Sequence, residues 1–466
     1  MTRSAIASRL IVSGLICLIV TTFAGLARLR AQDLRTVTEP TFPPAGVRLK
    51  ARRVAIGEAR TLRGRDESKP DTARIQMALD HCPTGHAVEL MPDGARNAFL
   101  SGPLSLKPGV TLRVAKGAIL FGSRNPRDYD LSPGSCGTLT RHGHGCKPLI
   151  SGDHVPNAAI MGPGTIDGRG WADLMGENIS WWGLAHEAKV KKLNQNCPRL
   201  IEMARSNNFT LYRILLRNSP NFHVLYRDGK GFTAWGVIID TPRTARNTDG
   251  IDPSSATDVT ITHCYIHAGD DDVAIKAGSG GLSSHLSVDH DHFYTGHGMS
   301  IGSNTNGGVG HIRVSDLTID GADNGLRIKS NSSRGGRVQN VVYRDVCIRD
   351  TPRPIVMDSH YSFYGARRGE IPTFTGITLR NVRISGPGRV LLDGYDAAHR
   401  LDITFDNVIL DASEGVRIRA DHARIRLGPG PVDFRPSGDD VKLIGEPGKG
   451  EPYHCRDKFT PMPASP

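Results

Sequence analysis

The chain has 466 residues, enough to bury the core of one large domain or of two. Glycine is abundant, with 53 residues, aromatic residues make up only 6%, and no long run of charge interrupts the chain. This composition argues against a helical bundle and against disorder. The net charge of +11 is common in proteins that meet a polyanion such as nucleic acid, anionic lipid or acidic polysaccharide, but it serves solubility equally well.

The first 27 residues have the pattern of a secretory signal. Arg3 and Arg9 form a basic start, residues 10–26 are apolar, and Gly25 and Ala27 suit the last positions before a cleavage site. A membrane anchor is the alternative, but no second apolar span follows. We expect a protein secreted to the extracellular space or in transit through a periplasm, with a net charge of +9 after cleavage because two arginines and no acids are removed.

Residues 28–68 are expected to form an N-terminal extension, and a helix is predicted directly after it. The stretch TARIQMALDHC, residues 72–82, places Ile75, Ala78, Leu79 and Cys82 at helical spacing. Because the open end of a stack of strands exposes unpaired backbone groups, we expect this helix to cap the first strands of the fold.

From residue 200 onward, short β-rich runs recur along the chain, and each is followed by Gly, Asp or Asn. Segments after these runs align on one isoleucine column, whose members lie 24, 26, 27 and 27 residues apart: Ile251, Ile275, Ile301, Ile328 and Ile355. Such a repeat is typical of stacked coils with strands ~4.8 Å apart. We predict an all-β, single-domain, right-handed parallel β-helix, or solenoid, over residues 69–440, followed by a loose C-terminal tail over 441–466.

The isoleucines should point into the core, so their neighbours should face outward and meet in a groove suited to an extended polymer. Asn247, Asp271 and His297 each lie four residues before an isoleucine of the column, and Arg327 and Lys329 flank Ile328 on the next coil. We therefore expect these five residues to meet in the groove. Asp249 falls in an inward column, and we expect the turn at Asp249–Gly250 to bend it back into the groove.

Seven cysteines follow the signal, so at least one is unpaired or pairs between chains. Disulfides are compatible with export. Cys136 and Cys146 bracket a glycine-rich stretch and are the best candidate pair. No CxxC motif occurs, so a zinc site is not expected, and His142 and His144 are more typical of a surface loop than of metal ligands.

Four short motifs occur in order on successive coils: NTDG (247–250), GDD (269–271), GHG (296–298) and RIK (327–329). In this order they resemble the family 28 glycoside hydrolases, the polygalacturonases, over roughly residues 70–410. The stretches SWWGLAHEAKVKKLNQNCPRLI, SPNFHV and TARNTDGIDP look especially like the bacterial endo-acting enzymes. Asp272 departs from the pattern, since many members carry Cys or Asn there; we expect it to be a solvated or hydrogen-bonded acid outside the chemistry.

The resemblance implies hydrolysis of α-1,4-linked galacturonan, the backbone of pectate, with inversion of configuration. Cleaving this bond needs an acid to protonate the leaving oxygen and a base to activate water. By the family pattern Asp270 is the acid, Asp249 and Asp271 hold the water, and His297 bonds to the acids. The substrate-binding residues would be Asn247, Arg327, Lys329 and Tyr361. We expect the enzyme to need no cofactor and no bound metal. We also expect it to be a monomer that binds neither nucleic acid nor a membrane.

Three alternatives remain. Exo-acting polygalacturonase, rhamnogalacturonan or xylogalacturonan activity is possible within the same family, although the lack of a separate N-terminal module favours endo action. A calcium-dependent β-helical pectate lyase would use the acids as a calcium site, but the order of the motifs argues against it. A non-catalytic β-helical glycan binder would have no need of three acids beside a histidine.

Overall fold

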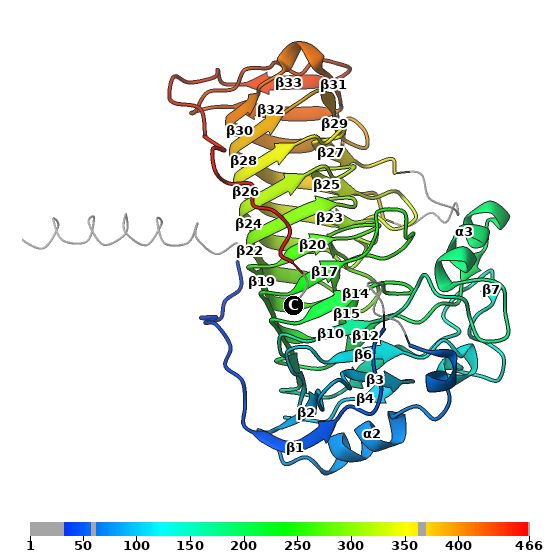
Figure 1. Cartoon of the computed structure of the whole chain (residues 1–466). Coiled ribbons are helices and arrows are strands. Elements are labelled where there is room, and N and C mark those ends of the chain that lie inside the picture. Colours follow the sequence, from blue (N-terminus) through cyan, green and yellow to red (C-terminus); the bar gives the residue numbers. More distant parts are fainter. Residues whose placement is uncertain (1–31, 57–61, 362–369, 465–466) are drawn as a thin grey trace, which may run out of the picture.

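The computed structural model describes residues 32–56, 62–361 and 370–464, so the predicted signal lies outside the described residues. The described chain forms a parallel β-helix (Figure 1). No helix within the described ranges is long and apolar enough to cross a membrane.

One continuous face of the β-helix is an eleven-stranded, wholly parallel sheet. Its strands are β4 (Leu104–Ser105), β8 (Ile150–Asp153), β12 (Ile201–Ala204), β15 (Val224–Arg227), β18 (Ile251–Ser254), β21 (Val273–Ile275), β23 (Met299–Gly302), β25 (Leu326–Lys329), β27 (Ile355–Asp358), β29 (Gly388–Asp393) and β31 (Val416–Asp421). We call its outward side the groove face.

The remaining faces are built by twenty further strands that also pair in parallel. They are β1 (Ala45–Lys50), β2 (Ala87–Met91), β3 (Ala98–Ser101), β5 (Thr111–Val114), β6 (Ile119–Gly122), β9 (Ala159–Met161), β10 (Thr165–Asp167), β13 (Thr210–Tyr212), β14 (Leu215–Arg217), β16 (Lys230–Trp235), β17 (Ile238–Asp240), β19 (Thr257–Thr262), β20 (Tyr265–His267), β22 (Ser283–Thr295), β24 (Val309–Asp320), β26 (Arg337–Arg349), β28 (Thr373–Ser385), β30 (Leu401–Leu410), β32 (Ala423–Leu427) and β33 (Val441–Ile444).

Apolar side chains stack inward from coil to coil and form the core. One such ladder passes through fully buried residues of successive groove-face strands: Ile150, Ile201, Val224, Ile251, Val273, Met299, Leu326 and Ile355. Burying a side chain of this size contributes about 1.5–3 kcal/mol. Because every coil adds to the same ladder, the core is continuous along the whole axis.

The predicted isoleucine column is right in its middle and wrong at its two ends. Ile275, Ile301 and Ile328 do pair in line, whereas Ile251 pairs with Val273 and Ile355 pairs with Leu326. Both end residues therefore belong to the neighbouring ladder, two positions earlier in the strand. They still face the core, because a shift of two residues keeps a strand's inward and outward faces.

Two α-helices accompany the coils within the described residues. The predicted capping helix is α2 (Thr72–His81), whose Ile75 and Leu79 are fully buried in the core cluster at the N-terminal end, beside β1 and β2 (Figure 1). Helix α3 (Trp181–Lys191) begins at Ser180, whose hydroxyl accepts a hydrogen bond from the Gly183 amide.

Helix α3 contacts β11 (Asn194–Gln195), which pairs antiparallel with β7 (Leu139–Thr140). The part of the chain that the structure describes also contains three short 3-10 helices: η1 (Gly64–Glu67), η2 (Pro126–Tyr129) and η3 (Ser413–Gly415).

The C-terminal residues are held against the body and are not loose as expected. Strand β33 still pairs with β32, and the chain beyond it runs back along the coils (Figure 1). There Cys455 forms a disulfide with Cys347 of β26, and Lys458 pairs with Asp316 at 2.9 Å. The domain limits drawn from the sequence stay predictions, but the described residues of 441–464 pack as part of the β-helix.

The expected disulfide Cys136–Cys146 is present, and the expected unpaired cysteines are found among the described residues. Cys82, Cys197 and Cys264 are free and buried. Burial raises the pKa of the Cys264 thiol well above its usual value, which keeps it in the unreactive neutral form.

Removing the Cys347–Cys455 disulfide should destabilise the protein more than removing Cys136–Cys146. The two bonds close segments of 108 and 10 residues, and a longer closed loop restricts the unfolded chain more. We expect Cys347→Ala/Cys455→Ser to lower the free energy of unfolding by about 2–4 kcal/mol in urea titrations followed by circular dichroism. A larger loss from Cys136→Ser/Cys146→Ser would contradict this.

Candidate active site

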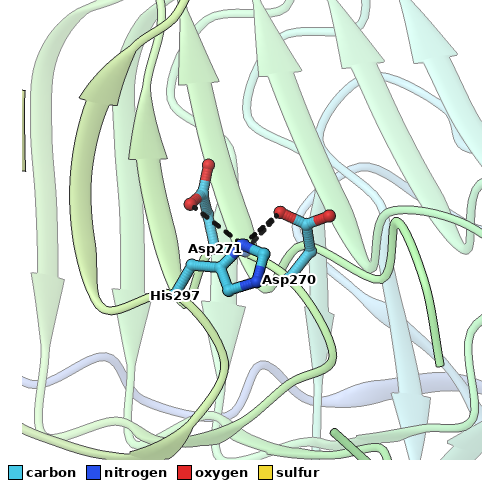
Figure 2. A group of neighbouring side chains, drawn as sticks. All are labelled: Asp270, Asp271 and His297. Atoms are coloured by element: carbon cyan, nitrogen blue, oxygen red, sulfur yellow. Dashed lines mark hydrogen bonds and ion pairs between the residues drawn. The ribbon is translucent and has the colours of Figure 1, made fainter. Parts of the chain in front are cut away.

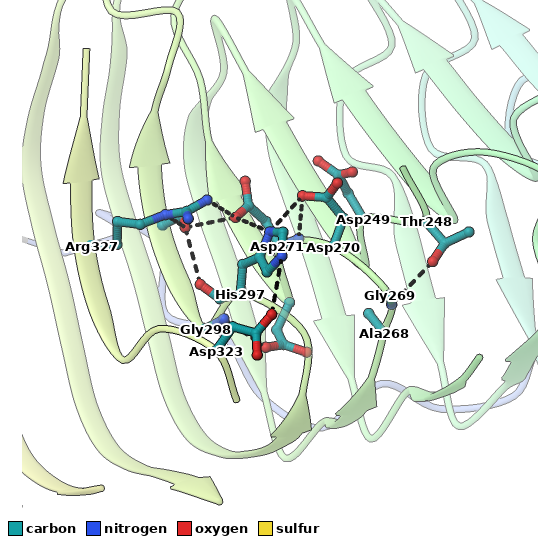
Figure 3. A network of polar contacts seen from close by, with 12 residues as sticks. Thr248, Asp249, Ala268, Gly269, Asp270, Asp271, His297, Gly298, Asp323 and Arg327 are labelled. Atoms are coloured by element: carbon teal, nitrogen blue, oxygen red, sulfur yellow. Dashed lines mark hydrogen bonds and ion pairs between the residues drawn. The ribbon is translucent and has the colours of Figure 1, made fainter. Parts of the chain in front are cut away.

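The predicted acids gather on the groove face, where four successive coils enter their strands (Figure 3). Asp249 precedes β18, Asp270 and Asp271 precede β21, and His297 precedes β23. Arg327 and Lys329 lie within β25 as outward-facing neighbours of the buried Ile328. Stacking in register thus brings together residues that lie 80 positions apart in the chain.

Asp271 is the most firmly held carboxylate of the group. Its Oδ1 accepts hydrogen bonds from Arg327 Nη2 at 2.6 Å and from Ser300 Oγ at 2.9 Å, and its Oδ2 accepts one from Lys329 Nζ at 2.8 Å. Burial alone would raise its pKa, but the charges of Lys329, Arg327 and His297 hold the pKa far below its usual value. Asp271 is therefore an anion at any pH at which the protein would work.

Asp270 contacts His297 and is the more accessible acid. The ring Nδ1 of His297 lies 3.0 Å from Asp270 Oδ1 and 3.9 Å from Asp271 Oδ1. Figure 2 shows the ring in contact with both carboxylates. The Asp270 side chain keeps 19% of its surface exposed, against 2% for Asp271. Burial raises the pKa of Asp270, but hydrogen bonding to His297 and the charge of that ring outweigh burial and lower it.

Asp249 faces the groove, as expected, and binds a cation that the sequence analysis did not assign to the site. Lys276 Nζ donates to Asp249 Oδ2 at 2.9 Å and also to Asp252, and it lies 4.3 Å from the centre of the Phe222 ring. Burial outweighs the charge of Lys276 and, together with the neighbouring acids, raises the pKa of Asp249 well above its usual value. The Lys276 pKa is raised in turn, because these acids outweigh the effect of burial.

The outward position of Lys276, next to Ile275, was visible in the sequence, but its partners were not. The other oxygens of the two acids, Asp249 Oδ1 and Asp252 Oδ1, are buried and have no hydrogen-bond partner among the described residues. Unpaired buried oxygens are costly unless a water or a ligand meets them.

The Gly-His-Gly turn positions His297 by bringing two backbones into close approach. Gly296 has φ +98°, and a Cβ there would lie 2.5 Å from the Asp270 carbonyl oxygen. Gly298 has φ +69° and donates its N–H to Asp272 Oδ2 at 2.9 Å. Only glycine adopts such conformations without strain at so close a contact.

Asp272 is hydrogen-bonded, as one of the two expected alternatives stated, but it is not solvated. Its side chain is fully buried, and its Oδ1 has no partner among the described residues. Burial raises its pKa well above the usual value, in spite of the Gly298 N–H. Asp272 thus lies in the interior beside the Gly-His-Gly turn, where burial favours its neutral form.

The remaining predicted residues border the acids on either side. Asn247 has φ +58°, accepts a hydrogen bond from Gln195 Nε2 at 3.0 Å, and lines a hollow of about 570 Å³ on the N-terminal side. Tyr361 lies on the C-terminal side, its ring centre 5.5 Å from Lys329 Nζ, and lines a second hollow of about 450 Å³. Asn247 on one side and Arg327, Lys329 and Tyr361 on the other therefore line two separate hollows, and the acids and His297 lie on the coils between them.

The ligand atoms of Asp270, Asp271 and His297 lie within 4.8 Å of one another, close enough to hold a metal ion. However, both oxygens of Asp271 already accept hydrogen bonds from Arg327 and Lys329. A bound divalent cation would face these two positive charges at short range. Two of the ligand atoms in this group are therefore already engaged by the chain's own cations.

Comparisons with known proteins agree with this geometry. Residues 100–423 match the family model described as Glycosyl hydrolases family 28. An endo-polygalacturonase of Pectobacterium carotovorum subsp. carotovorum is 44% identical over 84% of this chain and 92% of its own length. A polygalacturonase of Ralstonia nicotianae is 39% identical over 91% of this chain and 92% of its own.

The solved structure of a polygalacturonase from Erwinia carotovora ssp. carotovora superposes with a TM-score of 0.78 at 43% identity, and the match covers 84% of this chain and all of that one. The fold, the clustered carboxylates and a family match over most of the chain lead to one conclusion: the chain belongs to glycoside hydrolase family 28.

Proposed function

We propose that the protein is a polygalacturonase that hydrolyses α-1,4-galacturonosyl linkages of pectate with inversion of configuration, and that it acts within the polymer. The observation that carries this proposal is the meeting of three carboxylates with Arg327 and Lys329 in one groove. The acids supply what hydrolysis of a glycosidic bond requires. The cations suit a substrate that carries a carboxylate on every sugar.

Asp271 and Asp249 hold the attacking water in this proposal. Asp271 is ionised because Arg327 and Lys329 neutralise it, so it can accept a hydrogen bond from water while it stays in place. Asp249 contributes its Oδ1, which has no hydrogen-bond partner among the described residues. The proton that the buried acids retain belongs to the cluster as a whole and is shared within it.

Asp270 donates the proton to the leaving oxygen. It is the most exposed of the three acids, so it can reach a bound glycosidic oxygen, and His297 can deliver a proton to it. In the substrate-free site, burial raises the pKa of Asp270, but His297 and, to a smaller extent, Lys329 lower it by more, so the net shift is downward. A galacturonate carboxylate bound at Arg327 and Lys329 would offset this positive charge, raise the pKa and favour the protonated form.

Endo action is supported by the hollows on both sides of the acids, since a polymer cleaved internally must extend in both directions. The hollow on the Asn247 side is lined by Arg199, Arg227 and Arg246, of which the first two are ion-paired with Glu202. The matched relative named endo-polygalacturonase supports the same mode. We further infer export by the signal of residues 1–27, action as a monomer, and activity without cofactor or metal.

The reaction type can be tested directly on polygalacturonate. Hydrolysis should release new reducing ends without unsaturated uronides, because water attacks the sugar carbon and no double bond forms. Activity should also survive treatment with a chelator. The measurement follows, in the same sample, the reducing ends and the ultraviolet absorbance of unsaturated uronides. Chelator-sensitive activity accompanied by rising absorbance would favour the pectate lyase instead.

The roles of neighbouring aspartates are separable by a matched pair of variants. Asp270→Asn should lower kcat by roughly 10²–10⁴-fold, the usual contribution of a general acid, with little change in thermal stability. Asp272→Asn should cost less than about tenfold, about 1.4 kcal/mol of barrier, because Asp272 is buried, neutral and distant from solvent. Equal losses in the two variants would show that the division between them is wrong.

Lys276 should set the acidic limb of the pH profile. Lys276→Met removes the cation beside Asp249, so the pKa of Asp249 rises further and its anion forms only at higher pH. The acidic limb of kcat/KM against pH should therefore move to higher pH. Lys230→Met, which alters an exposed lysine paired with Asp258, is the control and should leave the profile in place; an unmoved limb in Lys276→Met would exclude this role.

A further inference from the structure

Past the acids, toward the C-terminal end, the groove face carries a strip of arginines that the reaction does not use. We call Arg353, Arg389, Arg417 and Arg419 the arginine strip. All four are exposed and line the hollow of about 450 Å³ that also contains Arg327, Lys329 and Tyr361. The strip is thus continuous with the proposed active site.

The register of the sheet explains the alignment of the strip. Arg389 pairs directly with Arg417 on the next coil, and Arg419 continues the column that passes from Arg327 through Val356 and Leu391. Successive coils lie ~4.8 Å apart, so the guanidinium groups follow the axis of the β-helix. Val356 is buried and Leu391 is half-buried between them, which leaves a partly apolar floor.

Two of the four side chains have no partner within the described part of the chain. Arg353 Nε donates to the Asp323 carbonyl oxygen at 3.3 Å, and Arg419 Nε donates to Asp421 at 2.7 Å. The side chains of Arg389 and Arg417 make no hydrogen bond or ion pair with any described residue. Two stacked like charges repel each other, so their alignment favours a bound anion that bridges them.

Acids border the strip on one side but leave these two arginines uncompensated. Asp358, Asp393 and Asp421 form the adjacent column of the same sheet. Asp393 is bonded to His360 at 2.7 Å, and Asp421 is paired with Arg419. Asp358 is half-buried, and its pKa is raised by burial and by Asp393, which reduces its negative charge. The outer surface of the strip therefore remains positive.

From this arrangement we infer that the arginine strip binds the carboxylates of galacturonan units several sugars beyond the cleavage point, and so gives the enzyme a preference for long, charged chains. The occupant is the same acidic polysaccharide as in the proposed function, on which this inference rests. Sugar ring faces would lie over Val356 and Leu391, with carboxylates on Arg389 and Arg417. Short oligomers that span only the acids and Lys329 would not reach the strip.

The test is the double variant Arg389→Gln/Arg417→Gln. Its matched control is Arg424→Gln/Arg426→Gln, which removes two exposed arginines of β32, in the other sheet, and changes the net charge equally. In the background of Asp270→Asn, which slows turnover, the Kd for polygalacturonate should rise about three- to tenfold in the strip variant and stay unchanged in the control. The dependence of Kd on salt should weaken in parallel, because fewer charges are neutralised on binding.

A second measurement uses the active proteins. The strip variant should raise KM for polygalacturonate by a similar factor and leave kcat/KM for short galacturonate oligomers unchanged, since these do not reach the strip. Unchanged binding, or an equal loss in the β32 control, would overturn the inference. If the unmodified protein fails to hydrolyse polygalacturonate, the proposed function fails, whereas the binding comparison still decides whether the strip holds this polymer.

Discussion

The parallel stacking of coils in register is the constraint on which the rest of this molecule depends. Each strand of the groove face hydrogen-bonds to the next coil ~4.8 Å away, and its inward residues complete a continuous apolar ladder. A slip by one residue would place this ladder in solvent and the outward residues in the core. Burial of the ladder therefore also determines which side chains meet in the groove, although it takes no part in the chemistry.

The buried carboxylates that this register brings together are paired with buried cations. Asp271 is neutralised by Arg327 and Lys329, and Asp249 shares Lys276 with Asp252. Buried charges are tolerated only when they are paired in this way. The pKa values of the two acids shift in opposite directions. Lys329, Arg327 and His297 lower the pKa of Asp271, whereas burial outweighs Lys276 and raises the pKa of Asp249. Neighbouring carboxylates of one residue type thus acquire different protonation states and can take different roles.

Arginines line the hollows on both sides of the acids, although on the N-terminal side Glu202 pairs with Arg199 and Arg227. Arg199, Arg227 and Arg246 lie on the N-terminal side, and the arginine strip lies on the C-terminal side. A polymer with a carboxylate on each sugar can meet this charge along its whole length, so binding far from the cleavage point can hold the scissile bond against the acids.

The sequence by itself determined the fold class, the inward column of Ile275, Ile301 and Ile328, and the four motifs of the site, because these depend on local period and on residue type. It misplaced Ile251 and Ile355 by two positions, since the coils differ in length and only pairing sets their offset. Tertiary structure alone decided that Lys276 meets Asp249, that Asp272 is buried, and that Cys455 reaches Cys347. Each of these depends on residues from different coils, or from opposite parts of the chain, that become neighbours only when the coils stack.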